Sequence, residues 1–247
     1  MIRRKFQKMI DWFIGCSGFY YKHWKGTFYP ADLPQKNWFN YYCTCFKTLE
    51  LNVTFYRFPQ LSFLQNWFEQ SPETFRFAVK APRIITHYRK FLNTSDLISD
   101  FYQVINEGLR EKLACVLFQL PPSFSYSEER LERIINSLDR SSHNVVEFRH
   151  ASWWTEHVYQ ELGKHNITFC GMSHPVLPKE IICNTPLLYH RMHGEGPLYA
   201  SDYTDVQLRK LADEIRSHSN LKEAFIYFNN DINAYAPNNA LKLNSMI

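Results

Sequence analysis

Charged and amide side chains recur in this chain at the points where short apolar runs end. They are Glu50, Asn52, Lys80, Gln119, Glu147, Arg149, Arg191, His193, Asn229 and Asn230. Burial of so many polar groups is unfavourable unless they are paired or used, so together they outline a site. Their two carboxylates, three permanent cations and one histidine favour a bound phosphate, carboxylate or enolate-like anion.

The chemistry that this set could perform is proton transfer beside a clamped anion. Acid and base roles fall to Glu147 and His193, and Lys80 and Glu50 complete the candidate catalytic set. These roles require surroundings that separate the pKa values of the two groups. A neutralised lattice of Glu and Arg filling a barrel is the structural alternative, because buried charges are normally paired whether or not they react.

A second group of side chains is expected to hold the ligand. Tyr20 and Trp24 belong to an aromatic and basic stretch after the first apolar run. They could stack on a base or a sugar, or they could pack the core of a long loop. The candidate ligand-binding set is Tyr20, Trp24, Asn52, Tyr56, His87, Gln119, Arg149, His150, Trp153, Arg191, Asn229 and Asn230.

A divalent metal ion is possible but not favoured. Glu50, Glu147 and His193 carry suitable donor atoms. The chain has no H-E-x-x-H motif and no C-x-x-C pair, and neighbouring Lys and Arg side chains would compete for the carboxylates. We therefore assign no metal ligands and leave the cofactor unknown. The six cysteines lack the spacing of a disulfide framework and are expected to be reduced and mostly buried.

Eight apolar runs alternate with helical stripes along the chain. The runs are residues 12–15, 48–51, 75–79, 114–120, 145–148, 167–171, 187–192 and 224–228. The stripes cover residues 38–46, 61–68, 97–105, 131–138 and 208–215, and Ser127 and Thr204 are candidate N-caps of the last two. This alternation predicts an α/β fold, a single (β/α)8 TIM-type barrel with functional groups at the C-terminal ends of its strands.

An open doubly wound sheet is the rival fold. It usually has a glycine-rich phosphate turn after its first strand, and Gly15-Cys16-Ser17-Gly18 does not match G-x-G-x-x-G. Three prolines within residues 172–186 predict an irregular sixth crossover with only a short helical turn near 179–182, and residues 238–243 predict a short final helix. The 247 residues fit one domain over 1–247, of which 1–11 are a basic N-terminal extension.

Several segments, in this order and spacing, make the chain resemble the YecE-like family, domain of unknown function seventy-two. They are Gly15-Cys16-Ser17-Gly18-Phe19-Tyr20, His23-Trp24-Lys25-Gly26, Glu50-Leu51-Asn52, Phe75-Arg76-Phe77-Ala78-Val79-Lys80, Leu117-Phe118-Gln119-Leu120-Pro121-Pro122, Val146-Glu147-Phe148-Arg149-His150, Arg191-Met192-His193-Gly194 and Tyr227-Phe228-Asn229-Asn230-Asp231. The resemblance implies a TIM-type barrel and no established activity. Cys16, Phe19 and Ala234 depart from the family pattern, which often has Thr, Trp and Gly at these positions.

Three functions are consistent with these features. The leading hypothesis is an enzyme acting on a small anionic, phosphate- or carboxylate-bearing metabolite. The alternatives are nucleic-acid binding or metal-assisted phosphodiester cleavage, to which the formal charge of +4 lends weak support, and a non-catalytic ligand-binding protein. No run reaches the roughly 20 apolar residues of a membrane helix, so we expect no membrane partner and a cytoplasmic location. The oligomeric state is left open.

Overall fold

A computed structural model describes residues 10–247, and its core is an eight-stranded parallel sheet. The strands are β1 (Asp11–Cys16), β2 (Thr48–Leu51), β3 (Arg76–Lys80), β4 (Leu113–Leu120), β5 (Asn144–Phe148), β6 (Thr168–Ser173), β7 (Leu187–Met192) and β8 (Glu223–Phe228). All eight predicted strands are confirmed, with boundaries within two residues. Arg3, Arg4, Lys5 and Lys8 of the predicted N-terminal extension lie outside the described residues, and Asp11 already belongs to β1.

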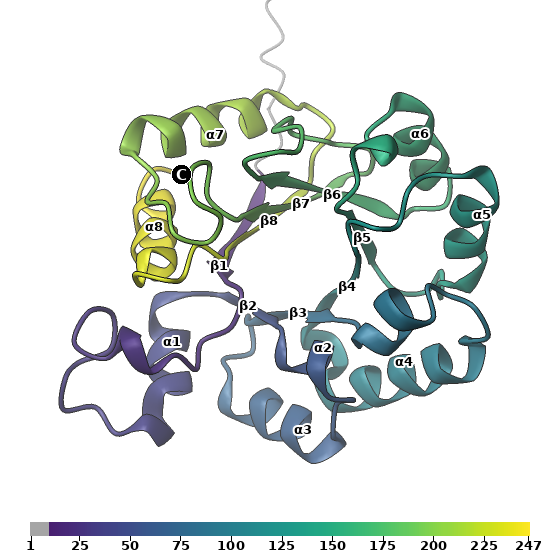
Figure 1. The fold of residues 1–247 in the computed structure, drawn as a ribbon. Coiled ribbons are helices and arrows are strands. Elements are labelled where there is room, and N and C mark those ends of the chain that lie inside the picture. Colours follow the sequence, from purple (N-terminus) through teal and green to yellow (C-terminus); the bar gives the residue numbers. More distant parts are fainter. Residues whose placement is uncertain (1–9) are drawn as a thin grey trace, which may run out of the picture.

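The sheet curls into a nearly closed barrel with the helices outside it (Figure 1). Its strand order is β1-β8-β7-β6-β5-β4-β3-β2, so β1 and β2 are the two strands that must meet to close it. In the described chain they are joined by one parallel bridge, between Ser17 and Glu50. The predicted (β/α)8 barrel is therefore confirmed, with its closure at the β1–β2 junction.

A tyrosine hydroxyl completes the β1–β2 junction where ladder hydrogen bonds are missing. The Tyr42 hydroxyl accepts from the backbone N–H of Cys16 at 2.8 Å and donates to the carbonyl oxygen of Thr48 at 3.0 Å. Gly15 makes this approach possible, because a Cβ atom there would lie 2.3 Å from the Thr48 oxygen. Gly15, the last residue of the first apolar run, is thus needed for barrel closure.

Most helices cover the outside of the barrel, and the short α2 lies at the rim of its C-terminal end. They are α1 (Trp38–Cys45), α2 (Val53–Tyr56), α3 (Leu61–Gln70), α4 (Ser95–Leu109), α5 (Glu128–Ser137), α6 (Glu156–Lys164), α7 (Asp205–Ser217) and α8 (Tyr235–Asn244). The predicted N-caps are confirmed: Ser127 accepts from the Arg130 backbone, and Thr204 forms a capping box with Gln207. The final helix has ten residues and begins at Tyr235, three residues earlier than predicted.

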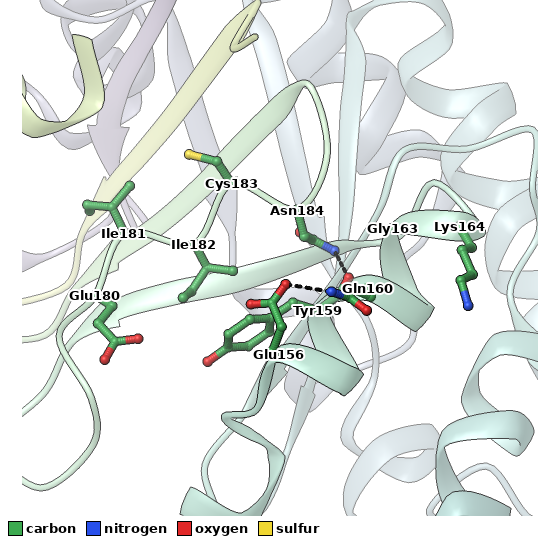
Figure 2. A pocket seen from close by; sticks show the side chains of 10 residues that line it. All are labelled: Glu156, Tyr159, Gln160, Gly163, Lys164, Glu180, Ile181, Ile182, Cys183 and Asn184. Atoms are coloured by element: carbon green, nitrogen blue, oxygen red, sulfur yellow. Dashed lines mark hydrogen bonds between the residues drawn. The ribbon is translucent and has the colours of Figure 1, made fainter. Parts of the chain in front are cut away.

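The sixth crossover is irregular, as predicted, but the expected helical turn near residues 179–182 is wrong, because no helix forms between β6 and β7. Asn184 holds this segment instead. Its Nδ2 atom donates to the carbonyl oxygens of Tyr159 and Ile167 at 3.1 and 2.9 Å, and its Oδ1 atom accepts from the Phe169 N–H at 2.9 Å. Figure 2 shows Asn184 beside α6, at the edge of an outer hollow of about 610 Å³.

The inside of the barrel is filled by side chains that alternate along the strands. A buried cluster includes Cys115, Leu117, Tyr189, Phe225 and Tyr227. Because side chains two apart share a face, the next inward position on several strands is a polar one. The apolar layer therefore forms the floor on which the polar groups rest.

Candidate functional site

A buried arginine at the centre of the mouth joins the two predicted carboxylates. Arg191, 1% exposed, donates from Nη1 to Glu147 Oε2 and from Nη2 to Glu50 Oε1, both at 2.7 Å. Tyr189, two residues earlier on β7, donates its hydroxyl to the other Glu50 oxygen at 2.6 Å. These four side chains come from β2, β5 and β7 and form the paired lattice that was the structural alternative for the site.

Arg149 and His193 form a second layer on this lattice. Arg149 Nε donates to Glu147, and its Nη2 donates to His193 Nε2 at 2.8 Å. Because Nε2 accepts this bond, the neutral imidazole carries its proton on Nδ1. The Nδ2 atom of Asn229 lies 3.1 Å from that nitrogen. A proton on Nδ1 therefore requires the Asn229 amide to be turned over, so that its oxygen accepts from the ring. The sequence predicts that Glu147 with Arg149, and Arg191 with His193, point inward together, because residues two apart on a strand share a face. The hydrogen bonds show that these four side chains converge.

This pairing fixes the charge of both proposed acid and base groups. Burial opposes ionisation of Glu147, but Arg149 and Arg191 outweigh it and lower the pKa to about 2. Burial together with the neighbouring Arg149 and Arg191 holds the pKa of His193 well below its ordinary value. Glu147 is thus a carboxylate and His193 a neutral ring throughout the neutral pH range.

Lys80 lies beside this layer at the end of β3 and differs from the other cations. Its Nζ donates to the neutral amide oxygen of Gln119 at 2.5 Å and lies 4.2 Å from the centre of the Phe55 ring. It makes no ion pair with any carboxylate of the described residues. Burial, and then Arg191, lower the pKa of Lys80 to about 7.

An aromatic hollow of about 560 Å³ opens at the rim between the end of β1 and α2. Tyr20, Asn52 and Tyr56 line it, and Tyr56 is 66% exposed. Because residues two apart on a strand share a face, the sequence predicts that Glu50 and Asn52 point inward together. They do not, because the backbone turns helical at Asn52 and the strand alternation ends at Leu51. Phe55 connects this hollow to Lys80. Its ring centre is 5.2 Å from that of Tyr56, which lines the hollow, and 4.2 Å from Lys80 Nζ.

Three candidate ligand-binding side chains, Trp24, Trp153 and Asn230, lie in the core. Trp24 is fully buried and donates its indole N–H to Asp231. Trp153 is also fully buried, stacked 4.0 Å from the ring centre of Phe148. The buried amide of Asn230 donates to backbone and side-chain oxygens at 2.9 and 2.7 Å. The two tryptophans and the Asn230 Nδ2 atom are thus used in contacts within the protein.

The two other candidate histidines, His87 and His150, form no hydrogen bond with Glu50, Glu147, Arg149 or Arg191. The half-buried ring of His87 packs 4.9 Å from Phe55, and burial together with Lys80 lowers its pKa to about 4. His150 is half-buried and hydrogen-bonds through Nδ1 to the hydroxyl of Ser152 at 2.8 Å.

Tyr189 and Phe55 are site neighbours that the sequence-based set missed. Tyr189 could have been found, because it lies two residues before Arg191 on the same strand face. Phe55 carried no periodic signal, since it belongs to a four-residue helix after β2.

Residues 10–247 contain neither a group of side chains that could hold a metal ion nor a disulfide. No group of three His, Cys, Asp or Glu side chains there has an arrangement that could hold a metal ion. Glu50 and Glu147 have arginine partners instead. The six cysteines are free thiols; Cys16, Cys115 and Cys170 are buried and the other three are half-buried. In the same part of the chain no helix is long and apolar enough to cross a membrane.

The fold and the site together define a (β/α)8 barrel protein with an arginine-paired polar centre at the C-terminal mouth. The chain belongs to the family described as "Protein of unknown function DUF72", whose model matches residues 13–247. This confirms the family resemblance in the sequence.

Similar proteins from two bacteria carry the family name UPF0759. The chain is 27% identical to UPF0759 protein YunF of Bacillus subtilis over 146 residues, and 28% identical to UPF0759 protein YecE of Escherichia coli K12 over 156 residues. These matches cover 55% and 63% of this chain, and the chain spans about half the length of each relative, 50% and 55%.

Two crystal structures of DUF72 family proteins have the same fold. The one from Thermotoga maritima is 29% identical, with a TM-score of 0.88 over 96% of this chain and 98% of that chain. The one from Enterococcus faecalis is 18% identical, with a TM-score of 0.82 over 96% and 95%. At the lower identity the likeness concerns the fold alone.

Proposed function

We propose that this chain is an enzyme that binds a small phosphate- or carboxylate-bearing metabolite at the barrel mouth. The observation that carries the proposal is the state of Lys80, a buried amine whose hydrogen-bond partner is a neutral amide. A buried cation without a counter-ion is unfavourable, and a bound anion would supply that counter-ion.

The charge balance of the mouth supports an anion. Two carboxylates, Glu50 and Glu147, stand against three cations, Lys80, Arg149 and Arg191, so protonated Lys80 leaves one positive charge in excess. Arg149 also keeps a donor for a ligand, because Nη1 has no hydrogen-bond partner among residues 10–247. A carboxylate bound by Lys80 and Arg149 would neutralise this excess, and a phosphate would more than neutralise it.

Proton transfer is assigned to Lys80 within this proposal. Glu147 is too acidic and too firmly paired to accept a proton readily, and the Nε2 lone pair of His193 is occupied by Arg149. Lys80, with its pKa of about 7, exchanges a proton near neutrality, which suits a general base or acid. Glu50, Glu147 and His193 then position the cations.

Thermal unfolding in increasing inorganic phosphate tests the proposal. Phosphate at about 100 times its dissociation constant should add about 2.7 kcal/mol to the free energy of unfolding. Lys80→Met should abolish most of this increment, while Lys210→Met, an exposed control on α7, should keep it. An equal phosphate response in all three proteins would contradict an anion site at Lys80. Binding of metabolites without any turnover would favour the non-catalytic alternative.

A second candidate function, nucleic-acid binding, is favoured by one feature of the rim. The guanidinium of Arg83 lies 5.7 and 5.4 Å from the ring centres of Tyr56 and Tyr88, which are 66% and 63% exposed. Such rings can stack on bases beside a cation. Tyr56→Ala or Tyr88→Ala should then weaken binding of a single-stranded oligonucleotide by about 1–3 kcal/mol in fluorescence anisotropy. Unchanged affinity in both variants would count against this candidate.

A further inference from the structure

Two lysines are buried among residues 10–247, and their hydrogen bonds differ in kind. Lys112, 5% exposed, donates to the carbonyl oxygens of Phe68 and Ser71 at 2.6 and 2.7 Å and to the Ser71 hydroxyl at 3.0 Å. An ammonium group has three N–H donors, so Lys112 is fully satisfied in its charged form. Lys80, 8% exposed, donates one hydrogen bond to the amide oxygen of Gln119, and its Nζ also lies over the ring of Phe55.

The surroundings of Lys80 favour the neutral amine. Burial disfavours its charge, and Arg191 and Arg149 do so further, while Glu147 and Glu50 act in the opposite direction and leave the pKa at about 7. About half of the Lys80 side chains are then unprotonated at neutral pH. An unprotonated amine has a lone pair that can attack a carbonyl carbon.

Building on the proposed anion site, we propose that Lys80 Nζ forms an imine with a small carbonyl compound whose neighbouring carboxylate or phosphate is held by Arg149. This assigns the substrate to the class of oxo acids and phosphorylated aldehydes or ketones. Gln119 hydrogen-bonds the amine, and the charges of Arg191 and Arg149 act on it, so the carbonyl compound is expected among the polar groups at the C-terminal ends of the strands.

The step balances without a further reactant. The Nζ lone pair forms a bond to the carbonyl carbon, and the C=O π electrons move to oxygen, which takes a proton from nitrogen to give a carbinolamine. The hydroxyl then leaves as water after accepting one proton from solvent, and the nitrogen lone pair forms the C=N bond. The product is a protonated imine, so the positive charge beside the arginine lattice is the same as in the ammonium form.

The anionic group of the substrate explains the position of Arg149. Nε and Nη2 of Arg149 are used by Glu147 and His193, which fix the guanidinium plane, and Nη1 is left for the ligand. With a carboxylate bound, three positive charges, the Lys80 imine, Arg149 and Arg191, then balance three negative charges, Glu50, Glu147 and the ligand carboxylate.

Reductive trapping followed by peptide mass spectrometry tests the inference. With limiting formaldehyde and cyanoborohydride at pH 7, Lys80 should be methylated up to about 1,000-fold faster than exposed lysines such as Lys210, because an ordinary lysine is almost fully protonated there. Pyruvate with borohydride should give one adduct at Lys80, and added inorganic phosphate should slow its formation. Lys80→Arg should lose the adduct, and Lys210→Met should keep it.

The outcomes separate the imine from the anion site. In one outcome, phosphate stabilises the protein while Lys80 reacts no faster than Lys210 with either carbonyl probe. That result would contradict imine formation and would still support the anion site. A chain that phosphate does not stabilise and that is not trapped overturns both. Trapping at Lys80 that persists without any phosphate protection overturns the part of the inference that places the anion beside the amine.

Discussion

At the scale of single residues, Lys80 works against folding. Its folded-state pKa of about 7 lies below the ordinary 10.5, so between these pH values the unfolded chain binds more protons and stability rises with pH. Below pH 7 the penalty is complete, at most about 5 kcal/mol. Lys80→Met should therefore raise the free energy of unfolding in urea titrations at pH 6, with little gain near pH 10.5. A Lys80→Met protein that is less stable at pH 6 would show that Lys80 is a structural cation.

Glu147 has the opposite effect, because it is the shared partner of two arginines. Its pKa falls from 4.5 to about 2 on folding, so its contribution is present above pH 4.5 and is lost as the pH falls through 2. Glu147→Gln should lower the free energy of unfolding by about 3–5 kcal/mol at pH 7, since it leaves buried arginine charge uncompensated. Glu129→Gln, which breaks an exposed pair with Arg133, is the control and should change stability by less than about 0.5 kcal/mol. Similar losses in both variants would contradict the lattice.

At the scale of elements, the β1–β2 junction depends on one hydroxyl. Tyr42→Phe removes the partner of the Cys16 N–H and of the Thr48 carbonyl, both inside the barrel wall. We expect a loss of about 1–3 kcal/mol in urea unfolding. Tyr41→Phe is a matched control, because no described residue hydrogen-bonds to the Tyr41 hydroxyl. Equal stability of the two variants would mean that the junction closes without the hydroxyl.

Helices and strands could be predicted from the sequence wherever apolar residues recur with the helical or strand period and pack on the core. Strand runs and helical stripes report burial directly, and caps such as Thr204 report local hydrogen bonds. The sixth crossover was less readable, because its backbone is held by Asn184, whose partners are set by tertiary structure. The end of strand alternation at Asn52 was likewise invisible, since no proline or glycine marks it.

At the scale of the whole molecule, the barrel brings distant polar residues to one place. The period of two along parallel strands was enough to predict that Glu147, Arg149, Arg191 and His193 converge, and they do. It could not predict which cation lacks a carboxylate, because that depends on side-chain reach across strands. Nor could it separate Tyr56, exposed at the rim, from Trp24, which packs in the core.

The central claim is that Lys80 binds an anion. Measuring the pKa of the Lys80 side chain tests this claim most directly. NMR of the lysine ε-methylene groups, with Lys80→Arg to assign the signal, gives the pKa of Lys80 with and without inorganic phosphate. We expect a pKa of about 7 in the free protein and a clear rise when phosphate binds, because the anion stabilises the ammonium form. A Lys80 pKa near 10.5, or one that phosphate leaves unchanged, would contradict the account.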